Sequence, residues 1–307
     1  MKNNIYKYLI LIFLYVFLPI KSYSLEQFNF DITNVEILEN GNLFKGRDKG
    51  VITSENGIVI NAESFEYNKI TNILNAYGNV KIEDKIQKIV IFTDSITYLK
   101  NLEIILTKNN SKAITEDKKI ITADNFKYEK NKNIINANGS VYLEDKNQDY
   151  SISAEEITYF KNDEKIISKG KTSSFIQSKY KINSSDILFL INDQIITSDN
   201  DTVLKDSNLN VYNLDDFVYL INEERLKGNN IVAISNFGLP KSDKLYFKNA
   251  IINLKDQSFI AKDTEVKIHN DIFGNSENNP RIKGVSSKKE QNITTIKKGI
   301  FTSCKEN

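Results

Sequence analysis

Residues Ala62–Lys85 read AESFEYNKITNILNAYGNVKIEDK, and 61 positions later residues Ala123–Lys146 read ADNFKYEKNKNIINANGSVYLEDK. Thirteen of the 24 aligned positions are identical, among them an aromatic residue near the start of each copy, Phe65 and Phe126. Self-similarity at a fixed period indicates one supersecondary unit that is stacked many times. A repeat architecture is therefore the first prediction.

The unit also returns at half of that period. Residues Thr93–Tyr98 lie 31 positions after Ala62–Tyr67, and Ala154–Tyr159 lie 31 positions after the second copy. Fainter copies follow at Ser185–Leu190, at Asp215–Leu220 and, after an insertion at 238–245, at Asn249–Leu254. We therefore predict that the repeating unit is about half as long as the first period and occurs about seven times between positions 57 and 265.

Each unit has the pattern of two β-strands. Apolar and polar residues alternate, β-branched and aromatic residues dominate, and Asn, Lys and Asp separate the runs. Within Ile73–Ile82, one face is predicted to carry Leu74, Ala76, Gly78, Val80 and Ile82. We predict an all-β jellyroll of long, mostly antiparallel strands, with an apolar inner groove.

The buried face must change sides within each unit. Ala62 has the opposite parity to Phe65 and Tyr67, so one strand cannot bury all three side chains without an irregularity. A bulge or corner resolves the conflict. The sequence therefore predicts a sheet that folds back on itself near residue 63.

Composition excludes several classes of protein. Hydrophobic residues make up 40% and charged residues 26% of the chain, and the net charge is +1 with both signs interspersed. Because there is no basic stripe, nucleic-acid binding is not expected. Prolines after residue 24 number only two, Pro240 and Pro280, which suits long uninterrupted strands.

The N-terminus has the features of an export signal. Lys2 and Lys7 precede an apolar run, Tyr8–Ile20, and small residues at Ser22–Ser24 offer a cleavage site. The run of about 13 residues is shorter than the roughly 20 that a membrane-spanning helix needs. We predict a cleaved signal peptide at 1–24 and an exported mature chain. An uncleaved anchor is the alternative.

Residues suited to catalysis are scarce. The one histidine, His269, is expected to be a surface or capping residue, and no metal cluster, phosphate-binding loop or nucleophile elbow occurs. The acidic pairs Glu83–Asp84 and Glu144–Asp145 are interpreted as turn residues at strand ends. The sequence predicts neither enzyme activity nor a cofactor nor a metal.

Cys304 is the single cysteine, and in an exported chain it points to a pairing partner outside this sequence. It ends the segment Gly299–Cys304 (GIFTSC). Together with the AxxFxY and NAxGNVxLED repeats, this ending resembles the LptD (OstA, organic solvent tolerance) family of lipopolysaccharide-assembly proteins. The residues 271–287 also look like the linker region of that family.

The resemblance implies an expected function. It covers nearly all of the mature chain, and members of the family have a periplasmic β-jellyroll that receives lipopolysaccharide from LptA. The jellyroll passes the lipid to an outer-membrane barrel that holds the lipoprotein LptE. On this basis we expect a location at the periplasmic face of the Gram-negative outer membrane, with lipopolysaccharide as cargo and an LptA-like bridge as partner through edge-strand pairing.

The chain also departs from the family. No barrel follows Cys304, so we expect a fragment or truncated product, with segments at 1–24, 25–48, 49–270 (the repeats) and 271–307 (a connector). The cysteine usual near the mature N-terminus is absent from residues 25–48. At most one of the domain-to-barrel disulfides of the family is then expected, through Cys304 and a cysteine outside this chain.

The predicted lipid-groove residues are the inward-facing positions of the two best copies. If the jellyroll stays open along one side, these residues line a channel for acyl chains. They are Ile60, Ala62, Phe65, Leu74, Ala76, Val80, Ile82, Ala123, Phe126, Ile135, Ala137, Val141 and Leu143.

Two alternatives to an LptD-like domain stay open. One is a free-standing LptA-like bridge protein, which would have no use for the FTSC ending. The other is a secreted polysaccharide-active enzyme on a parallel β-helix, against which the two-strand unit and the lone histidine count.

Overall fold

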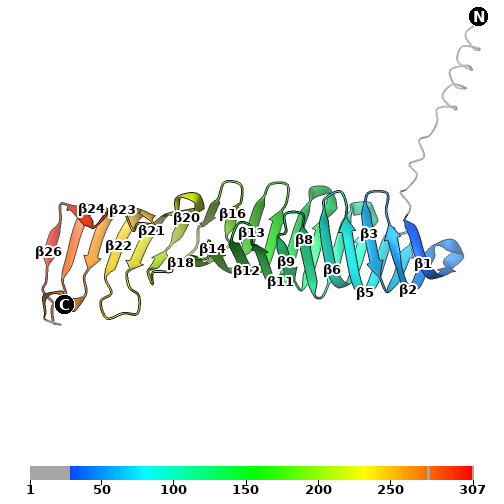
Figure 1. The fold of residues 1–307 in the computed structure, drawn as a ribbon, viewed down its shortest axis with the longest axis horizontal. Helices are drawn as coiled ribbons and strands as arrows, with labels where there is room; N and C mark the ends of the chain where they lie inside the picture. Colours follow the sequence, from blue (N-terminus) through cyan, green and yellow to red (C-terminus); the bar gives the residue numbers. More distant parts are fainter. Residues whose placement is uncertain (1–27, 275–276, 306–307) are drawn as a thin grey trace, which may run out of the picture.

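The computed structural model describes residues 28–274 and 277–305, so the predicted signal peptide lies outside the described residues. The described chain is all-β, with 26 strands and five short 3-10 turns. Figure 1 shows the strands crossing the long axis of an elongated stack, from β1 (Asn29–Leu38) at one end to β26 (Ile300–Thr302) at the other. The predicted fold class is confirmed.

The strands are short or long according to their place in the repeat. The N-terminal half contains β1, β2 (Leu43–Thr53), β3 (Ile58–Ala62), β4 (Ser64–Asn68), β5 (Ile73–Asp84), β6 (Ile89–Leu99), β7 (Ile104–Lys108), β8 (Ser111–Thr115), β9 (Ile120–Ala123), β10 (Asn125–Glu129), β11 (Ile134–Asp145), β12 (Tyr150–Phe160) and β13 (Lys165–Lys169). The C-terminal half contains β14 (Lys171–Ile176), β15 (Tyr180–Ser185), β16 (Leu188–Leu190), β17 (Ile195–Ser198), β18 (Thr202–Lys205), β19 (Val211–Leu214), β20 (Asp216–Leu220), β21 (Arg225–Ile234), β22 (Lys244–Asn253), β23 (Phe259–Lys267), β24 (Arg281–Glu290), β25 (Ile293–Lys297) and β26. The 3-10 turns are η1 (Glu39–Gly41), η2 (Lys100–Leu102), η3 (Lys130–Lys132), η4 (Ile221–Glu223) and η5 (Asn270–Phe273).

Every described strand pairing is antiparallel. The long strands pair with two partners each, one for each half. For example, residues 73–77 of β5 pair with β4, and its residues 81–84 pair with β3. The parallel β-helix of the enzyme alternative is therefore wrong for the described residues.

Two half-sheets follow from this pairing. We call sheet A the half that contains β4, β7, β10, β13, β16, β17, β20 and β25, and sheet B the half that contains β3, β8, β9, β14, β15, β18, β19 and β26. Long strands such as β5, β6, β11 and β12 run through both. The line where they cross from one sheet to the other is the bend.

The bend lies where the sequence predicted a corner. Glu63 separates β3 from β4, and opposite it Gly78 and Asn79 form a bulge in β5 with positive φ values of 79° and 45°. Gly139 repeats the first of these with φ of 80°. Gly78 therefore belongs to the bulge and not to the inward face of β5, because the irregularity turns the chain there.

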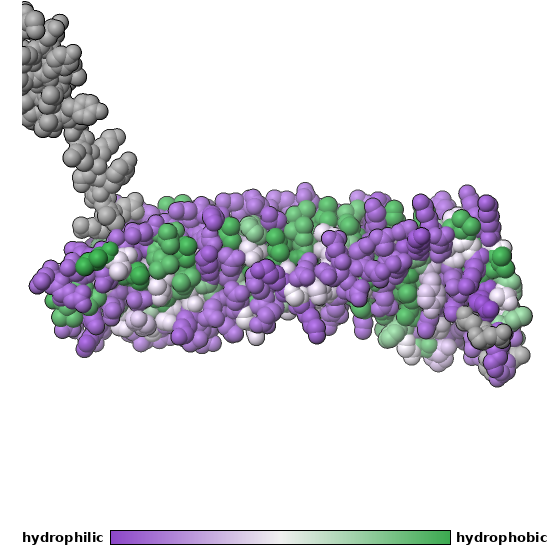
Figure 2. Space-filling view, turned by 180° about the vertical axis from the view of Figure 1, so that it is seen from behind, coloured by the Kyte–Doolittle hydropathy of each residue, from purple (hydrophilic) through white to green (hydrophobic). Residues whose placement is uncertain are grey.

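The core lies between sheets A and B. The inward residues of both sheets form a single apolar cluster that runs from Phe28 to Ala261. The segments predicted at 25–48 and 271–307 take part in the same stack, since β1 and β2 lie at its start and β24, β25 and β26 at its end. Figure 2 shows mostly hydrophilic side chains on one outer face, with apolar patches among them.

Candidate functional site: an apolar interior with a polar seam

All thirteen predicted groove residues point into the interior. Their exposed fractions run from 0% at Ile60, Leu74 and Leu143 to 8% at Ala123, and all belong to the one core cluster. The side chains are contributed by sheet A, such as Phe126, and by sheet B, such as Ile82. The structure thus brings together residues that lie up to 83 positions apart, from Ile60 to Leu143.

A column of aromatic side chains runs through the interior of sheet A. Its members recur once in every repeat unit and are exposed by 5% or less: Tyr67, Tyr98, Tyr128, Tyr159, Phe189 and Tyr219. Burial raises the pKa of the Tyr98, Tyr128 and Tyr159 hydroxyls far above the ordinary value, so they remain protonated donors. The Tyr98 hydroxyl donates to Glu103 Oε2 at 2.6 Å, and the Tyr159 hydroxyl donates to Glu164 Oε1 at 2.8 Å.

Opposite the bend, two rows of turns face each other. Row A joins the strands of sheet A at residues 69–72, 100–103, 130–133, 161–164, 191–194, 221–224 and 254–257. Row B joins those of sheet B at 54–57, 84–88, 115–119, 145–149, 176–179 and 206–210. We call the line between the two rows the polar seam, because polar side chains bridge it.

The bridges of the polar seam each join one residue from sheet A or row A to one from sheet B or row B. They are Asn56 Nδ2 to Glu103 Oε2 (2.5 Å), the Tyr128 hydroxyl to Asp84 Oδ2 (2.8 Å), Lys119 Nζ to Glu164 Oε2 (3.1 Å), Gln194 Nε2 to Gln148 Oε1 (3.1 Å), Lys179 Nζ to Glu224 Oε1 (3.3 Å) and the Tyr212 hydroxyl to Gln257 Oε1 (2.8 Å). The side that the sequence analysis imagined as open is thus bridged by side chains along the described stack.

The row A residues of these bridges occupy one structural position. Each ends its turn in the left-handed conformation: Glu103, Glu164, Gln194, Glu224 and Gln257 have φ values of 54°, 44°, 57°, 47° and 61°. Sequence analysis missed this position. The recurrence of glutamate at Glu103, Glu164 and Glu224, two repeat units apart each time, was the available signal.

The acidic pairs at strand ends have two roles. As predicted, they shape turns, since Asp84 Oδ1 accepts the backbone N–H groups of Ile86 and Gln87. Asp145 Oδ1 does the same for Asn147 and Gln148. The second oxygen of each carboxylate faces the polar seam, where Asp84 meets Tyr128 and Asp145 meets a lysine.

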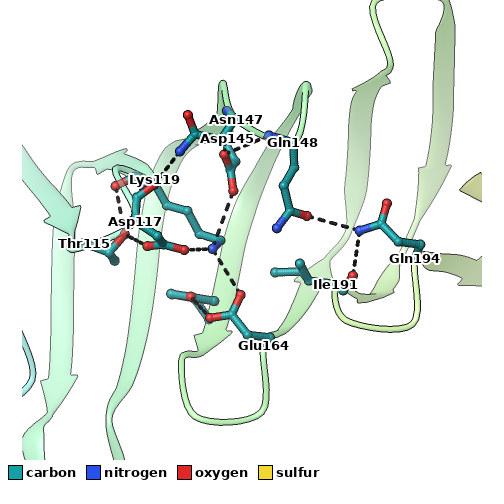
Figure 3. A network of polar contacts seen from close by, with 10 residues as sticks. Thr115, Asp117, Lys119, Asp145, Asn147, Gln148, Glu164, Ile191 and Gln194 are labelled. Atoms are coloured by element: carbon teal, nitrogen blue, oxygen red, sulfur yellow. Dashed lines mark hydrogen bonds and ion pairs between the residues drawn. The ribbon is translucent and has the colours of Figure 1, made fainter. Parts of the chain in front are cut away.

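The most highly charged part of the polar seam surrounds Lys119. Its side chain is only 1% exposed, and its Nζ lies 3.1 Å from Glu164 Oε2 and 3.5 Å from Asp145 Oδ2, with Asp117 as a third partner. Figure 3 shows Glu164 reaching this amine from a different turn. Burial alone would lower the pKa of Lys119, but the carboxylates of Asp117 and Glu164 raise it above its ordinary value. The lysine is therefore charged at neutral pH.

Pockets occur on the other side of the molecule, along the bend. Three of about 570, 940 and 590 Å³ are lined by bend residues, including Glu63 and Asn79 in the first, Ser153 and Thr172 in the second, and Lys227 and Asn249 in the third. None of the three is lined by a bridge of the polar seam. Among the described residues, no three His, Cys, Asp or Glu side chains gather as a metal site.

The two singled-out residues near the C-terminus lie away from the seam. His269 precedes η5, and its Nδ1 lies 2.9 Å from Asp243 Oδ1, in keeping with a capping position. Cys304 is exposed, and its carbonyl oxygen accepts a hydrogen bond from Arg281 Nη1 at 2.8 Å. In the described part of the chain, no helix has the length and apolar character needed to cross a membrane.

One bridge predicts a pH dependence. The Tyr180 hydroxyl donates to Glu224, and this contact, with Lys179 beside it, holds the pKa of Glu224 below its ordinary 4.5. A lowered folded-state pKa stabilises the fold above pH 4.5, and that stability is lost as the pH falls through the folded value. We expect Tyr180→Phe to lower the free energy of unfolding at pH 7 by about 1.5–3 kcal/mol and by much less at pH 3.

The control for this variant is a neighbouring tyrosine. Tyr219 packs edge-on against Tyr180, and within the described residues its buried hydroxyl makes no hydrogen bond. Tyr219→Phe should therefore leave urea unfolding unchanged at both pH values. Equal losses in the two variants would contradict the role given to Glu224.

These features define an antiparallel β-jellyroll with a continuous apolar interior and a polar seam. No protein-family model matches the sequence, and no curated protein matches it either. Among solved structures, the stack is similar to LptH of Pseudomonas aeruginosa, described as the LptA-homologous periplasmic component of the lipopolysaccharide transport device. The identity is 16%, the match covers 38% of this chain and 84% of LptH, and the TM-score is 0.34. A likeness at this level assigns no function.

Proposed function

We propose that this chain is a non-catalytic, periplasmic lipid carrier that takes up the acyl chains of lipopolysaccharide between sheets A and B. The observation that supports the proposal is the apolar core, which continues through the stack from Phe28 to Ala261. Stacked rungs of a repeat give such an interior any length that a cargo requires. The export signal predicted at 1–24 supports a place outside the cytoplasm.

The interior matches the energetic needs of a multi-acylated lipid. Each methylene that leaves water gains about 0.8 kcal/mol, so a chain of a dozen carbons costs on the order of 10 kcal/mol to expose. A carrier that replaces the contacts between the two sheets with contacts to acyl chains avoids this cost. The cargo must then separate the sheets, since the interior residues are in mutual contact.

The ends of the stack support partners that extend it. Among the described residues, β1 pairs only with β2, and β25 and β26 pair only with β24, so their outer edges are available. Ile293 and Ile300 on β25 and β26 are 70% and 74% exposed. Free strand edges recruit further strands. We propose an LptA-like partner at the β1 end and an LptD barrel with LptE at the β26 end.

A free-standing bridge would present the same two edges. We favour the LptD-like role because the exposed apolar residues at the β26 end include Phe301, within the GIFTSC ending. Purified barrel should bind the β26 end, whereas a bridge protein should bind only other jellyrolls.

The cargo is tested by photo-crosslinking. A benzophenone amino acid at Phe65 (4% exposed) or Val80 (1% exposed) should crosslink to lipopolysaccharide, because both side chains point between the sheets. The same probe at Lys81, whose side chain is 41% exposed and bonded to Glu83, should give little product. Equal labelling at the three positions, or none at any, would refute the interior as the lipid site.

A further inference from the structure

We propose that the polar seam is a latch, at which sheets A and B separate with the bend as hinge, and that the Lys119–Glu164 bridge is its strongest fastening. The proposal deepens the proposed function, since it names where acyl chains enter the interior. Two independent features carry it: the backbone is continuous at the bend but not at the seam, and the bridges of the seam differ greatly in strength.

The bend cannot come apart without breaking strands. β5, β6, β11 and β12 each run through both sheets, so peptide bonds join the sheets there. The bulges at Gly78 and Gly139, with their positive φ values, provide points about which the halves of a strand can pivot. Hinges of this kind are a few residues that absorb a change in backbone angles.

The seam is joined differently. Backbone hydrogen bonds between neighbouring turns run along a row: Lys130 N donates to Glu103 O at 3.0 Å, and Lys161 N donates to Asn133 O at 3.1 Å, both within row A. Each row is therefore a continuous strip. The bridges between the two strips are side-chain contacts, which can break while every ladder of sheets A and B stays intact.

The bridges are unequal. Gln148–Gln194 and Tyr212–Gln257 are hydrogen bonds between neutral groups. At Lys119 a lysine that is 1% exposed meets carboxylates on two turns of row B and on one turn of row A. A buried charge pair holds far more strongly than a neutral hydrogen bond, because separation leaves a charge without its partner. Figure 1 places β9 and β12, which flank these turns, near the middle of the stack.

What lies beneath the latch fits an entry route. The rings of Tyr128 and Tyr159 are buried directly under the polar seam, and their hydroxyls bond to Asp84 and Glu164. Opening at Lys119 would therefore expose aromatic rings first and then the aliphatic core. Amphipathic side chains of this type suit a boundary between water and hydrocarbon.

The test measures the width of the polar seam directly. Spin labels are attached to cysteines at Lys146, in row B, and Asp163, in row A, whose side chains are 81% and 63% exposed, in a Cys304→Ser chain. In the lipid-free protein, Glu164→Gln should lengthen and broaden the distance between the labels. Loss of one charge-assisted hydrogen bond should raise the open population about tenfold or more.

A matched substitution serves as the control. Glu116 bonds to Lys88, but both lie in row B, so Glu116→Gln removes an ion pair without touching a contact across the seam. Its label distance should equal that of the parent. Lys119→Met, which also removes the cation, should open the seam at least as far as Glu164→Gln. If circular dichroism shows that it is unfolded, the Glu164→Gln result decides.

The outcomes separate the latch from the cargo. An unchanged label distance in Glu164→Gln would overturn the latch and leave the ion pair a purely structural contact. If the seam opens in Glu164→Gln and added lipid A widens it in the parent, the latch admits the proposed cargo. If the seam opens but lipid A neither widens it nor crosslinks at Phe65, the latch stands and the proposed lipid function fails.

Discussion

Replacing Lys119 by alanine is expected to lower the free energy of unfolding by about 3–5 kcal/mol. The lysine neutralises Asp145, which is 2% exposed, together with Asp117 and Glu164. Its loss leaves three neighbouring carboxylates without a cation, one of them in the interior. Urea unfolding followed by tyrosine fluorescence is a suitable measurement, since the chain has 15 tyrosines and no tryptophan.

An exposed lysine provides the comparison. Lys88 pairs with Glu116, but both side chains are more than half exposed, so Lys88→Ala should cost no more than about 1 kcal/mol. The two variants delete the same side chain from neighbouring turns of row B. Equal losses in stability would show that burial of Lys119 contributes little.

Replacing Phe126 by alanine is expected to cost about 3–5 kcal/mol. The ring is 2% exposed between sheets A and B, and its removal leaves a cavity that the flanking ladders prevent from collapsing. Because each rung of a repeat protein contacts mainly its neighbours, the loss should appear first as faster hydrogen exchange in β7, β10 and β11.

The control for Phe126 lies on the outer face. Phe175 in β14 is 45% exposed, so Phe175→Ala removes the same ring with little change in buried area and should cost less than about 1 kcal/mol. A comparable loss in both variants would mean that the ring at Phe126 packs no better than one on the surface.

Much of the fold follows from the sequence because side chains along a strand alternate between its two faces. Alternation in Ile73–Ile82 identified Leu74, Ala76, Val80 and Ile82 as inward residues, and all four are exposed by 1% or less. The parity change between Ala62 and Phe65 located the bend. These are local properties, and each unit repeats them, which made the pattern legible without any tertiary information.

The polar seam could not be predicted in the same way. Its bridges join residues such as Asp84 and Tyr128, 44 positions apart, or Lys119 and Glu164, 45 positions apart, and these separations match neither one repeat unit nor two. A contact across the seam depends on how far row B is displaced along the stack relative to row A. Strand twist and the bulges at the bend set that displacement, and no single unit contains it.

The amino-acid sequence alone determined the strand content, the repeat unit, the inward residues and the corner at Glu63, since these depend on alternation and parity within a unit. The tertiary structure alone decided that Lys119 is buried among carboxylates and that side chains join the two sheets opposite the bend. A lysine between Asp117 and Lys118 on one side and Ile120 on the other has the pattern of an exposed turn residue. It becomes buried because the turns of a later repeat approach it from the facing sheet.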